Sequence, residues 1–216
     1  MKLVIEAIER HKIVVIMRKL PDAQILPVTE ALYDGGIRVI EVTFDQSDPD
    51  CLLRTGSAIQ AIAESFQGRM HVGAGTVLTK QQVDTAKASG ASFIVSPNTD
   101  SEVIAHSVEQ GLLSIPGALT PSEIVLAHHS GASFVKLFPG GDFGPGYVKA
   151  ICAPINHIPI VVVGGVDANN MKDFLKAGAV GIGVGSNIVD KKLIESGSYA
   201  QLTELAKKYT QQIDVS

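Results

Sequence analysis

The sequence predicts an α/β protein, a single-domain (βα)8 TIM barrel with an extra N-terminal helix, and the domain spans residues 1–216. Two observations lead to this fold class. Short apolar runs alternate with longer amphipathic stretches to the end of the chain, and the alternation repeats roughly every 23 residues. A doubly wound sheet would need fewer strands or a longer chain. No linker or shift of composition interrupts the pattern, so one domain is the simplest interpretation.

The apolar runs predict parallel strands that are buried on both faces. Each run is followed by a stretch with helical periodicity, as in Ala23–Leu32, where the apolar residues fall on one face. Lys2–His11 precedes the first strand and is expected to be a helix that closes the bottom of the barrel, and Tyr199–Ile213 is expected to be the last helix. The predicted strands are Ile13–Met17, Val39–Phe44, His71–Val77, Phe93–Ser96, Leu113–Ile115, Phe134–Phe138, Ile158–Val163 and Val180–Val184.

Glycines and threonines mark the ends of the predicted helices. Glycines such as Gly90 and Gly111 stand just after a helical stretch and just before a strand, where a left-handed residue stops a helix. Three threonines with Gln or Glu three residues later fit capping boxes, so we assign them a structural role. These pairs are Thr79 with Gln82, Thr99 with Glu102, and Thr120 with Glu123.

Composition excludes several classes of function. The 216 residues carry a net charge of −4 without a basic cluster, which argues against nucleic acid or an anionic membrane as a partner. No segment reads as a signal peptide or a membrane span. Cys51 and Cys152 have no C-x-x-C spacing, so we expect a reduced, cytoplasmic protein.

One lysine interrupts an apolar strand. Lys136 lies within Phe134–Phe138, and burying its ammonium group costs several kcal/mol unless the charge is paired or the pKa falls. A desolvated lysine with a lowered pKa is a good nucleophile towards carbonyls, with which it forms a Schiff base. The alternative is a structural lysine that is paired or extends its charged end to water.

A carboxylate is predicted to meet Lys136. In a TIM barrel the site lies at the C-terminal ends of the strands, and side chains two residues apart share a face of a strand. Alternation turns Glu41 and Thr43 inward, together with Lys136 of the sixth predicted strand. A lysine and a carboxylate in one apolar pocket suit nucleophilic and acid–base chemistry, whereas a buried salt bridge is the structural alternative.

Arg18 and Thr76 are expected beside this pair. Arg18 ends the first strand, and Thr76 shares a face with Ala74 by alternation, which would place its hydroxyl in the barrel. Arg18 could instead be a charge on the rim, and Thr76 could simply fill its strand.

The ends of the last two strands predict a phosphate site. Gly164-Gly165 and Gly185-Ser186 leave backbone amides uncovered, and in TIM barrels these loops often hold phosphate. Tight turns without a ligand are the alternative.

No metal is expected to be required. His71, His106, His128 and His129 show no metal-binding spacing, and the sequence has no C-x-x-C or H-x-x-x-H motif.

The same residues carry a family resemblance that covers nearly the whole chain. The chain resembles the class I aldolases of the 2-keto-3-deoxy-6-phosphogluconate (KDPG) and 4-hydroxy-2-oxoglutarate (KHG) family. The order and strand positions of the motifs agree. The motifs are Ile13–Arg18, Gly35–Phe44, Gly73–Val77, Ser96-Pro97, Ile115–Gly117, Lys136–Pro139, Phe143–Pro145, Gly164–Val166 and Gly183–Ser186.

The resemblance implies cleavage of a 2-oxo acid to pyruvate and an aldehyde, without a metal or other cofactor, by a homotrimer. It makes Lys136 the Schiff-base lysine and Glu41 the proton carrier. The remaining residues that it assigns to the substrate are Arg18, Thr76, Pro116, Gly164, Gly165, Gly185 and Ser186.

Two positions depart from the family pattern. Asp45 stands where many members have an arginine, and Val162-Val163 stand where many have Pro-Thr. KDPG, its galactonate-derived epimer and unphosphorylated KHG therefore stay open as substrates. Two other classes also remain, a phosphate-binding isomerase or epimerase and a sugar-phosphate binding protein without catalysis.

Overall fold

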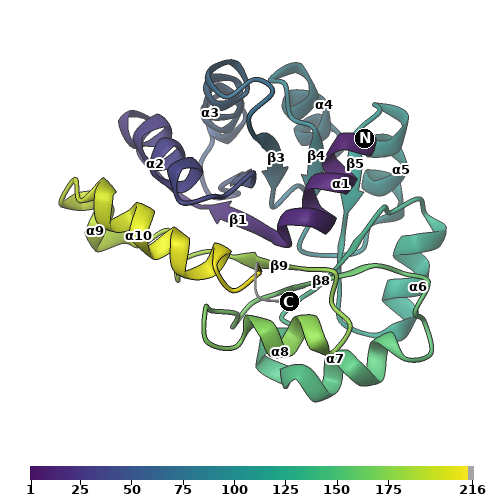
Figure 1. Ribbon diagram of the computed structural model, residues 1–216. Coiled ribbons are helices and arrows are strands. Elements are labelled where there is room, and N and C mark those ends of the chain that lie inside the picture. Colours follow the sequence, from purple (N-terminus) through teal and green to yellow (C-terminus); the bar gives the residue numbers. More distant parts are fainter. Residues whose placement is uncertain (214–216) are drawn as a thin grey trace.

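A computed structural model describes residues 1–213 and shows a nearly closed barrel of parallel strands surrounded by helices (Figure 1). The predicted (βα)8 barrel is thereby confirmed, and residues 214–216 of the expected domain lie outside the described residues. The strand order is β5-β4-β3-β2-β1-β9-β8-β7-β6. The strands are β1 (Ile13–Met17), β2 (Val39–Thr43), β3 (His71–Gly75), β4 (Phe93–Val95), β5 (Leu113–Ile115), β6 (Gly117–Ala118), β7 (Val135–Leu137), β8 (Ile160–Val163) and β9 (Gly181–Val184).

The helices connect successive strands and form the outer layer. α1 has the predicted bounds Lys2–His11, the predicted stretch Ala23–Leu32 lies within α2, and the last helix begins at the predicted Tyr199 but ends at Thr210 instead of Ile213. The helices are α1 (Lys2–His11), α2 (Asp22–Asp34), α3 (Cys51–Ser65), α4 (Lys80–Ala88), α5 (Ser101–Glu109), α6 (Pro121–His129), α7 (Gly144–Cys152), α8 (Met171–Lys176), α9 (Lys191–Glu195) and α10 (Tyr199–Thr210), with a 3-10 turn η1 (Gly141–Phe143) before α7.

The fifth strand of the barrel is divided in two by Pro116. β5 pairs with β4, whereas β6 pairs with β7. The barrel closes here because the amide of Ser133 donates to the carbonyl of Ser114 at 2.9 Å and the amide of Lys136 donates to the carbonyl of Pro116 at 2.9 Å. The sequence predicted only the first half, Leu113–Ile115, since a change of pairing partner leaves no mark on hydrophobic periodicity.

The predicted alternation holds on the strands that carry Lys136 and Glu41. Phe134 packs in the cluster inside the barrel, while Val135 and Leu137 pack in the larger core between strands and helices. On β2, Val39 lies inside and Ile40 lies outside. Both polar side chains are therefore set on the inner face by the period-2 geometry of a strand.

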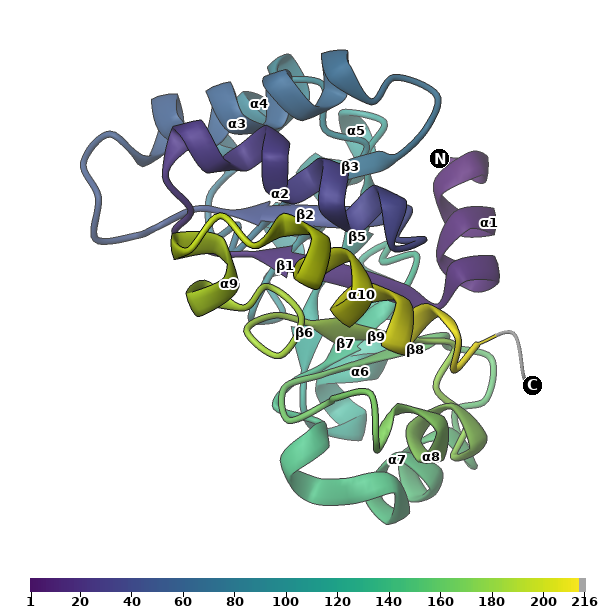
Figure 2. The same cartoon turned by 60° about the vertical axis from the view of Figure 1, so that its left-hand side comes forward.

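The interior of the barrel is closed at one end by α1, as predicted. Val4, Ala7 and Ile8 of this helix are buried in the same cluster as the inward side chains of the strands. Figure 2 shows α1 across one end of the barrel. The C-terminal ends of the strands lie at the opposite end.

The helix caps confirm one of the three predicted capping boxes in full, show only the threonine half of the second, and correct the third. Thr79 accepts a bond from the amide of Gln82, and Thr120 forms a complete capping box with Glu123. Thr99 does not cap α5; the N-cap is Asp100, whose carboxylate accepts from the first-turn amides at 2.9 and 3.2 Å. A carboxylate next to the helix start outcompetes the threonine hydroxyl, which instead donates to the carbonyl of Gly117.

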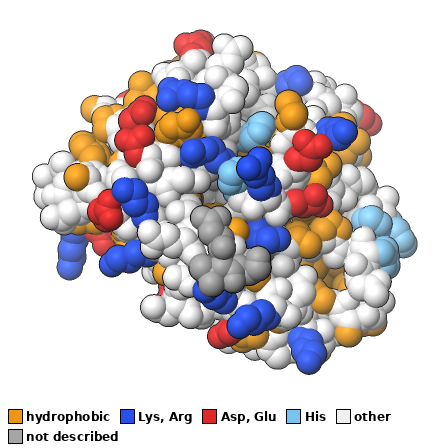
Figure 3. Space-filling model, in the orientation of Figure 1, with side chains coloured by type: hydrophobic (Ala, Val, Ile, Leu, Met, Phe, Trp, Pro, Cys, Tyr) orange, Lys and Arg blue, Asp and Glu red, His pale blue; other side chains and the backbone are white. Residues whose placement is uncertain are grey.

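Charges of both signs are intermingled on the face that α1 covers (Figure 3). Within residues 1–213, none of the helices has the length and apolar character that a membrane span requires.

Candidate active site

Lys136 and Glu41 reach into the barrel from opposite sides. β7 and β2 are separated by three strands on one side of the sheet order, and both side chains line one small interior cavity. Lys136 is 6% exposed and Glu41 is 2% exposed. The rest of the cavity wall is apolar, for example Val161 and Val163. The predicted meeting of the lysine with the carboxylate is therefore observed.

Burial and charge act against each other on this pair. Burial lowers the pKa of the Lys136 amine, the charge of Glu41 opposes that change, and Arg18 lowers the pKa further. Burial raises the pKa of Glu41, and the charges of Lys136 and Arg18 oppose it. Both shifts favour neutral forms, which suit an amine that attacks a carbonyl and a carboxyl that holds a proton.

The pair is not a structural salt bridge. Neither the Lys136 nitrogen nor the Glu41 carboxylate makes a hydrogen bond or a direct ion pair with any residue between 1 and 213. Two buried ionisable groups without a hydrogen bond or an ion pair cost stability, so a structural role does not account for them.

The neighbouring strand leaves room for Glu41. A Cβ atom on Gly75 of β3 would lie 2.7 Å from Glu41 Oε1 and 3.0 Å from Thr43 Cγ2. Only glycine at this position allows the carboxylate to keep its place, because a real Cβ does not approach an oxygen so closely.

Thr76 is placed differently from the prediction. Ala74 faces the outer core, so the alternation that was expected to turn Thr76 inward with Ala74 is wrong. Thr76 follows the end of β3 and has φ 56°, a left-handed conformation that strains a β-branched residue and breaks the alternation. Such strain is common at functional sites.

A chain of glutamines holds the strained turn at Thr76. Gln46 Nε2 donates to the carbonyl of Thr76 at 2.7 Å, and Gln82 Nε2 donates to Gln46 Oε1 at 2.9 Å. Gln82 in turn accepts from the amide of Leu78 at 2.7 Å. The sequence did not predict this role of Gln46, because Gln46 and Thr76 are 30 residues apart and no local pattern indicates their contact.

The remaining predicted residues lie around the mouth of the barrel. Arg18 is exposed at the end of β1, yet near enough to act on the charges of Glu41 and Lys136. Pro116 is buried beside Lys136, whose amide donates to its carbonyl. Phe138, which alternation places on the face of Lys136, has its ring centroid 4.8 Å from the lysine nitrogen.

The two glycine turns lie side by side. Asn187 Nδ2 donates to the carbonyl of Val166 at 3.0 Å and so ties the loop after β9 to the loop after β8. Gly164 and Gly165 have φ 88° and 71°, values that favour glycine. The amides of residues 164–166 and 185–187 donate no hydrogen bond to any residue of the described chain, and we refer to them as the open amides.

Asp45 stands at the departure from the family pattern and is paired. Lys19 Nζ lies 2.9 Å from Asp45 Oδ2, and the hydrogen bonds from Lys19 and Ser47 lower the pKa of Asp45 to about 2. Lys19, which follows Arg18, thus places a cation beside Asp45, the position at which many family members have an arginine. Its ammonium group is engaged by the Asp45 carboxylate.

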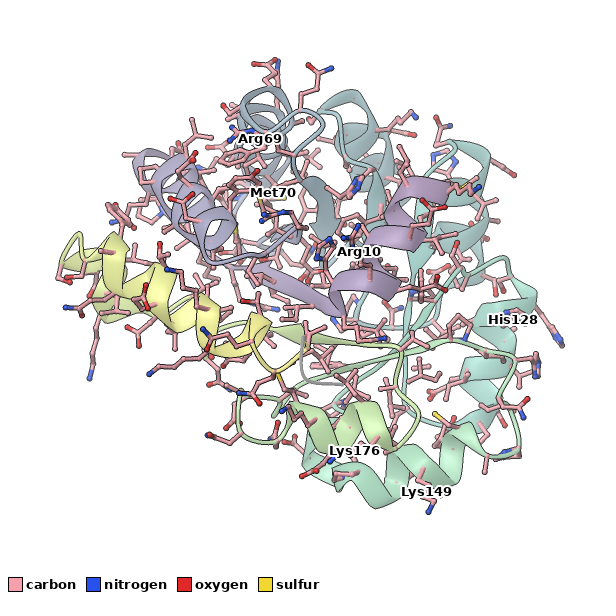
Figure 4. All side chains as sticks on the ribbon, in the orientation of Figure 1. Arg10, Arg69, Met70, His128, Lys149 and Lys176 are labelled. Carbon is pink, nitrogen blue, oxygen red and sulfur yellow. The ribbon has the colours of Figure 1, made fainter. Side chains whose placement is uncertain are left out.

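The histidines lie away from this site. His128, for example, is on α6 at the periphery of the molecule (Figure 4). In the described part of the chain, no group of three or more His, Cys, Asp or Glu side chains is arranged to hold a metal ion.

Comparison with known families decides the class of the protein. The family described as "KDPG and KHG aldolase" matches residues 4–205. The chain belongs to this aldolase family. The expected enzyme class, a class I aldolase and carbon–carbon lyase, is thereby confirmed.

This aldolase is similar to named aldolases over most of its length. It is 36% identical over 217 residues to the 2-dehydro-3-deoxy-phosphogluconate aldolase of Treponema pallidum (strain Nichols), covering 98% of each chain. It is 33% identical over 177 residues to the 2-dehydro-3-deoxy-6-phosphogalactonate aldolase of Escherichia coli (strain K12), covering 82% of this chain and 83% of the relative.

One similar structure shows a covalent state. The aldolase also resembles the KDPG aldolase of Legionella pneumophila, in which pyruvate was captured at low pH as a covalent carbinolamine. The TM-score is 0.82 at 27% identity, with 93% of this chain and 95% of that chain covered. A carbinolamine precedes an imine, so this neighbour agrees with Schiff-base chemistry in the family.

Proposed function

We propose that this aldolase cleaves a 4-hydroxy-2-oxo acid to pyruvate and an aldehyde through an imine on Lys136. The substrates in view are a 2-keto-3-deoxy sugar-acid phosphate, such as KDPG or its galactonate-derived epimer, and 4-hydroxy-2-oxoglutarate. The observation that carries the proposal is that Lys136 and Glu41 line one apolar cavity and form no ion pair with each other. The relatives named for gluconate- and galactonate-derived substrates support this substrate class.

Lys136 attacks the C2 carbonyl of the substrate to form a carbinolamine. The neutral carboxyl of Glu41 gives its proton to the carbinolamine hydroxyl, which leaves as water, so that a protonated imine and the Glu41 carboxylate remain. The buried site suits the neutral amine that this attack needs, because burial lowers the lysine's pKa. The imine then withdraws electrons from C3.

Glu41 removes the proton of the C4 hydroxyl, directly or through water. The C3–C4 bond breaks, the aldehyde leaves, and the bonding electrons form an enamine on the lysine. Glu41 returns its proton to C3, and hydrolysis of the resulting imine releases pyruvate and restores the amine. Its raised pKa suits a group that holds a proton between two steps.

The other residues position the substrate. Arg18 pairs with the carboxylate of the 2-oxo acid by a charge-assisted contact, and Thr76 and Pro116 border the pyruvate part. The open amides of Gly164, Gly165, Gly185 and Ser186 bind the far end of the substrate, where a phosphorylated substrate carries its phosphate.

Trapping with borohydride tests the imine. Reduction in the presence of pyruvate is expected to add a fixed mass to Lys136, and Lys136→Arg is expected to lose both the adduct and pyruvate release. An unmodified Lys136 would contradict the proposal, and activity retained by Lys136→Arg would favour a phosphate-binding isomerase or epimerase. Binding of pyruvate analogues without turnover of any 4-hydroxy-2-oxo acid would favour a binding protein.

We also propose that the enzyme is a cytoplasmic homotrimer. Its two cysteines, Cys51 and Cys152, are free, which fits a reducing compartment. Leu53 of α3 is 73% exposed and Leu78, before the adjacent α4, is 37% exposed, and apolar side chains of this kind suit a subunit contact. Light scattering after size-exclusion chromatography is expected to give three times the monomer mass, and a monomer or dimer would contradict it.

A further inference from the structure

The loop after β7 packs directly on the glycine turn after β8. The amide of Gly140 donates to the carbonyl of Val163 at 2.9 Å. A side chain on Gly141 would collide with the carbonyl of Gly164, so the two loops touch backbone to backbone. The residue that follows, Asp142, is held by this contact next to the open amides.

The carboxylate of Asp142 lies against the second glycine of the turn. Asp142 Oδ1 is 2.9 Å from the position that a Cβ atom on Gly165 would take. The side chain is exposed, and it makes no hydrogen bond or ion pair with any of residues 1–213. A negative charge therefore stands beside Gly165, whose amide the proposed function assigns to the far end of the substrate.

No side chain in the surrounding loops neutralises this charge. Residues 138–147, 164–170 and 185–190 contain three aspartates and neither lysine nor arginine. Asp167 and Asp190 are engaged by backbone amides, Asp167 in its own turn and Asp190 as the cap of α9. The lysines that follow on α8 and α9 form no ion pair with Asp142, and Lys149 of α7 points away from the molecule (Figure 4).

We propose that Asp142 is a specificity-determining residue that discriminates against a terminal phosphate, so that the preferred substrates are unphosphorylated 2-keto-3-deoxy sugar acids. A carboxylate repels a phosphate dianion over a few ångströms, whereas it accepts hydrogen bonds from the hydroxyl groups of an uncharged tail. The open amides then donate to the oxygens of those hydroxyls. This inference rests on the proposed function for the identity of the reaction.

The first test is a matched pair of substrates, 2-keto-3-deoxygluconate and its 6-phosphate, with pyruvate release as the readout. The native enzyme is expected to have the higher kcat/KM for the unphosphorylated acid. Asp142→Asn is expected to raise kcat/KM for the 6-phosphate about tenfold through KM, and to lower it a few-fold for the unphosphorylated acid. Asp34→Asn, an exposed carboxylate at the end of α2, is the control and is expected to change neither value.

A second measurement does not depend on catalysis. Inorganic phosphate, titrated into the protein and followed by NMR, is expected to bind about tenfold more tightly to Asp142→Asn than to the native protein. Raised ionic strength is expected to shrink that difference, because salt screens an exposed charge. Equal phosphate affinity, or a native preference for the 6-phosphate that Asp142→Asn leaves unchanged, would overturn the proposal. Tighter phosphate binding without a borohydride adduct at Lys136 would support the role of Asp142 and overturn the aldolase mechanism proposed for this chain.

Discussion

Replacement of Glu41 by glutamine separates two effects of this residue, its transfer of a proton and the influence of its charge on the pKa of Lys136. The variant keeps the size of a side chain that is 2% exposed and removes its charge. The proton carrier is lost, and general acid–base catalysis of this kind contributes about 10²–10⁴-fold, or roughly 2.7–5.4 kcal/mol of barrier. We therefore expect pyruvate release to slow by that factor.

The same change is expected to make Lys136 a better nucleophile at lower pH. The charge of Glu41 raises the pKa of Lys136 against the effect of burial, while Arg18 lowers it. Without Glu41 the two lowering influences act alone, so the pKa of the lysine falls further. The midpoint of borohydride trapping with pyruvate, measured across pH, is expected to move to lower pH although turnover is slower.

Three outcomes would refute this reasoning. An unchanged or raised trapping midpoint would show that Glu41 does not act on Lys136, and turnover within a few-fold of the native rate would show that Glu41 does not carry the proton. Glu6→Gln, on the outside of α1 at the closed end of the barrel, is the matched control. A shift in that variant would assign the effect to net charge.

Three further predictions follow from other contacts. Burial lowers the pKa of Lys136 below 10.5, so between its pKa in the folded protein and 10.5 the unfolded chain binds more protons than the native protein. The free energy of unfolding is therefore expected to rise with pH in that range. Urea unfolding measured across pH is expected to show a smaller rise in Lys136→Met. Gly141→Ala is expected to cost about 1–3 kcal/mol by overpacking, whereas Gly146→Ala, with open space around its Cβ position, is expected to be neutral or stabilising in the same unfolding assay. Gln46→Ala and Gln46→Glu both remove the donor to the Thr76 carbonyl, and each is expected to lower kcat/KM about tenfold; an undiminished value in Gln46→Glu would show that the turn does not need that bond.

The fold was predictable because parallel strands in a barrel are buried on both faces and read as uninterrupted apolar runs. The same period-2 rule placed Glu41 and Lys136 together, since both lie inside regular strands whose alternation is unbroken. The rule failed at Thr76, where a positive φ follows the last residue of β3. Nothing in the local sequence announces that conformation.

Residues that act across the loops were beyond sequence reasoning. The contact of Gln46 with Thr76 and that of Asp142 with Gly165 depend on how separate loops pack at the barrel mouth. The sequence contained one indication that Asp142 lies near the site, because this charged residue follows a glycine pair just after the end of a strand. The pairing of Lys19 with Asp45 is likewise a property of two adjacent loops, after β1 and after β2.

The closure of the barrel by α1 has a consequence for the order of events. The α1 helix fills one end of the barrel interior with Val4, Ala7 and Ile8. We therefore expect ligands to approach Lys136 from the other end. In the proposed mechanism the lysine holds the pyruvate fragment at the inner position, and the aldehyde fragment lies between that fragment and the mouth. In the synthetic direction we therefore expect pyruvate to bind before the aldehyde, and we expect an aldehyde that arrives first to act as a competitive inhibitor of pyruvate. The helix at the far end of the barrel would thus set the order of binding in a reaction in which it takes no chemical part.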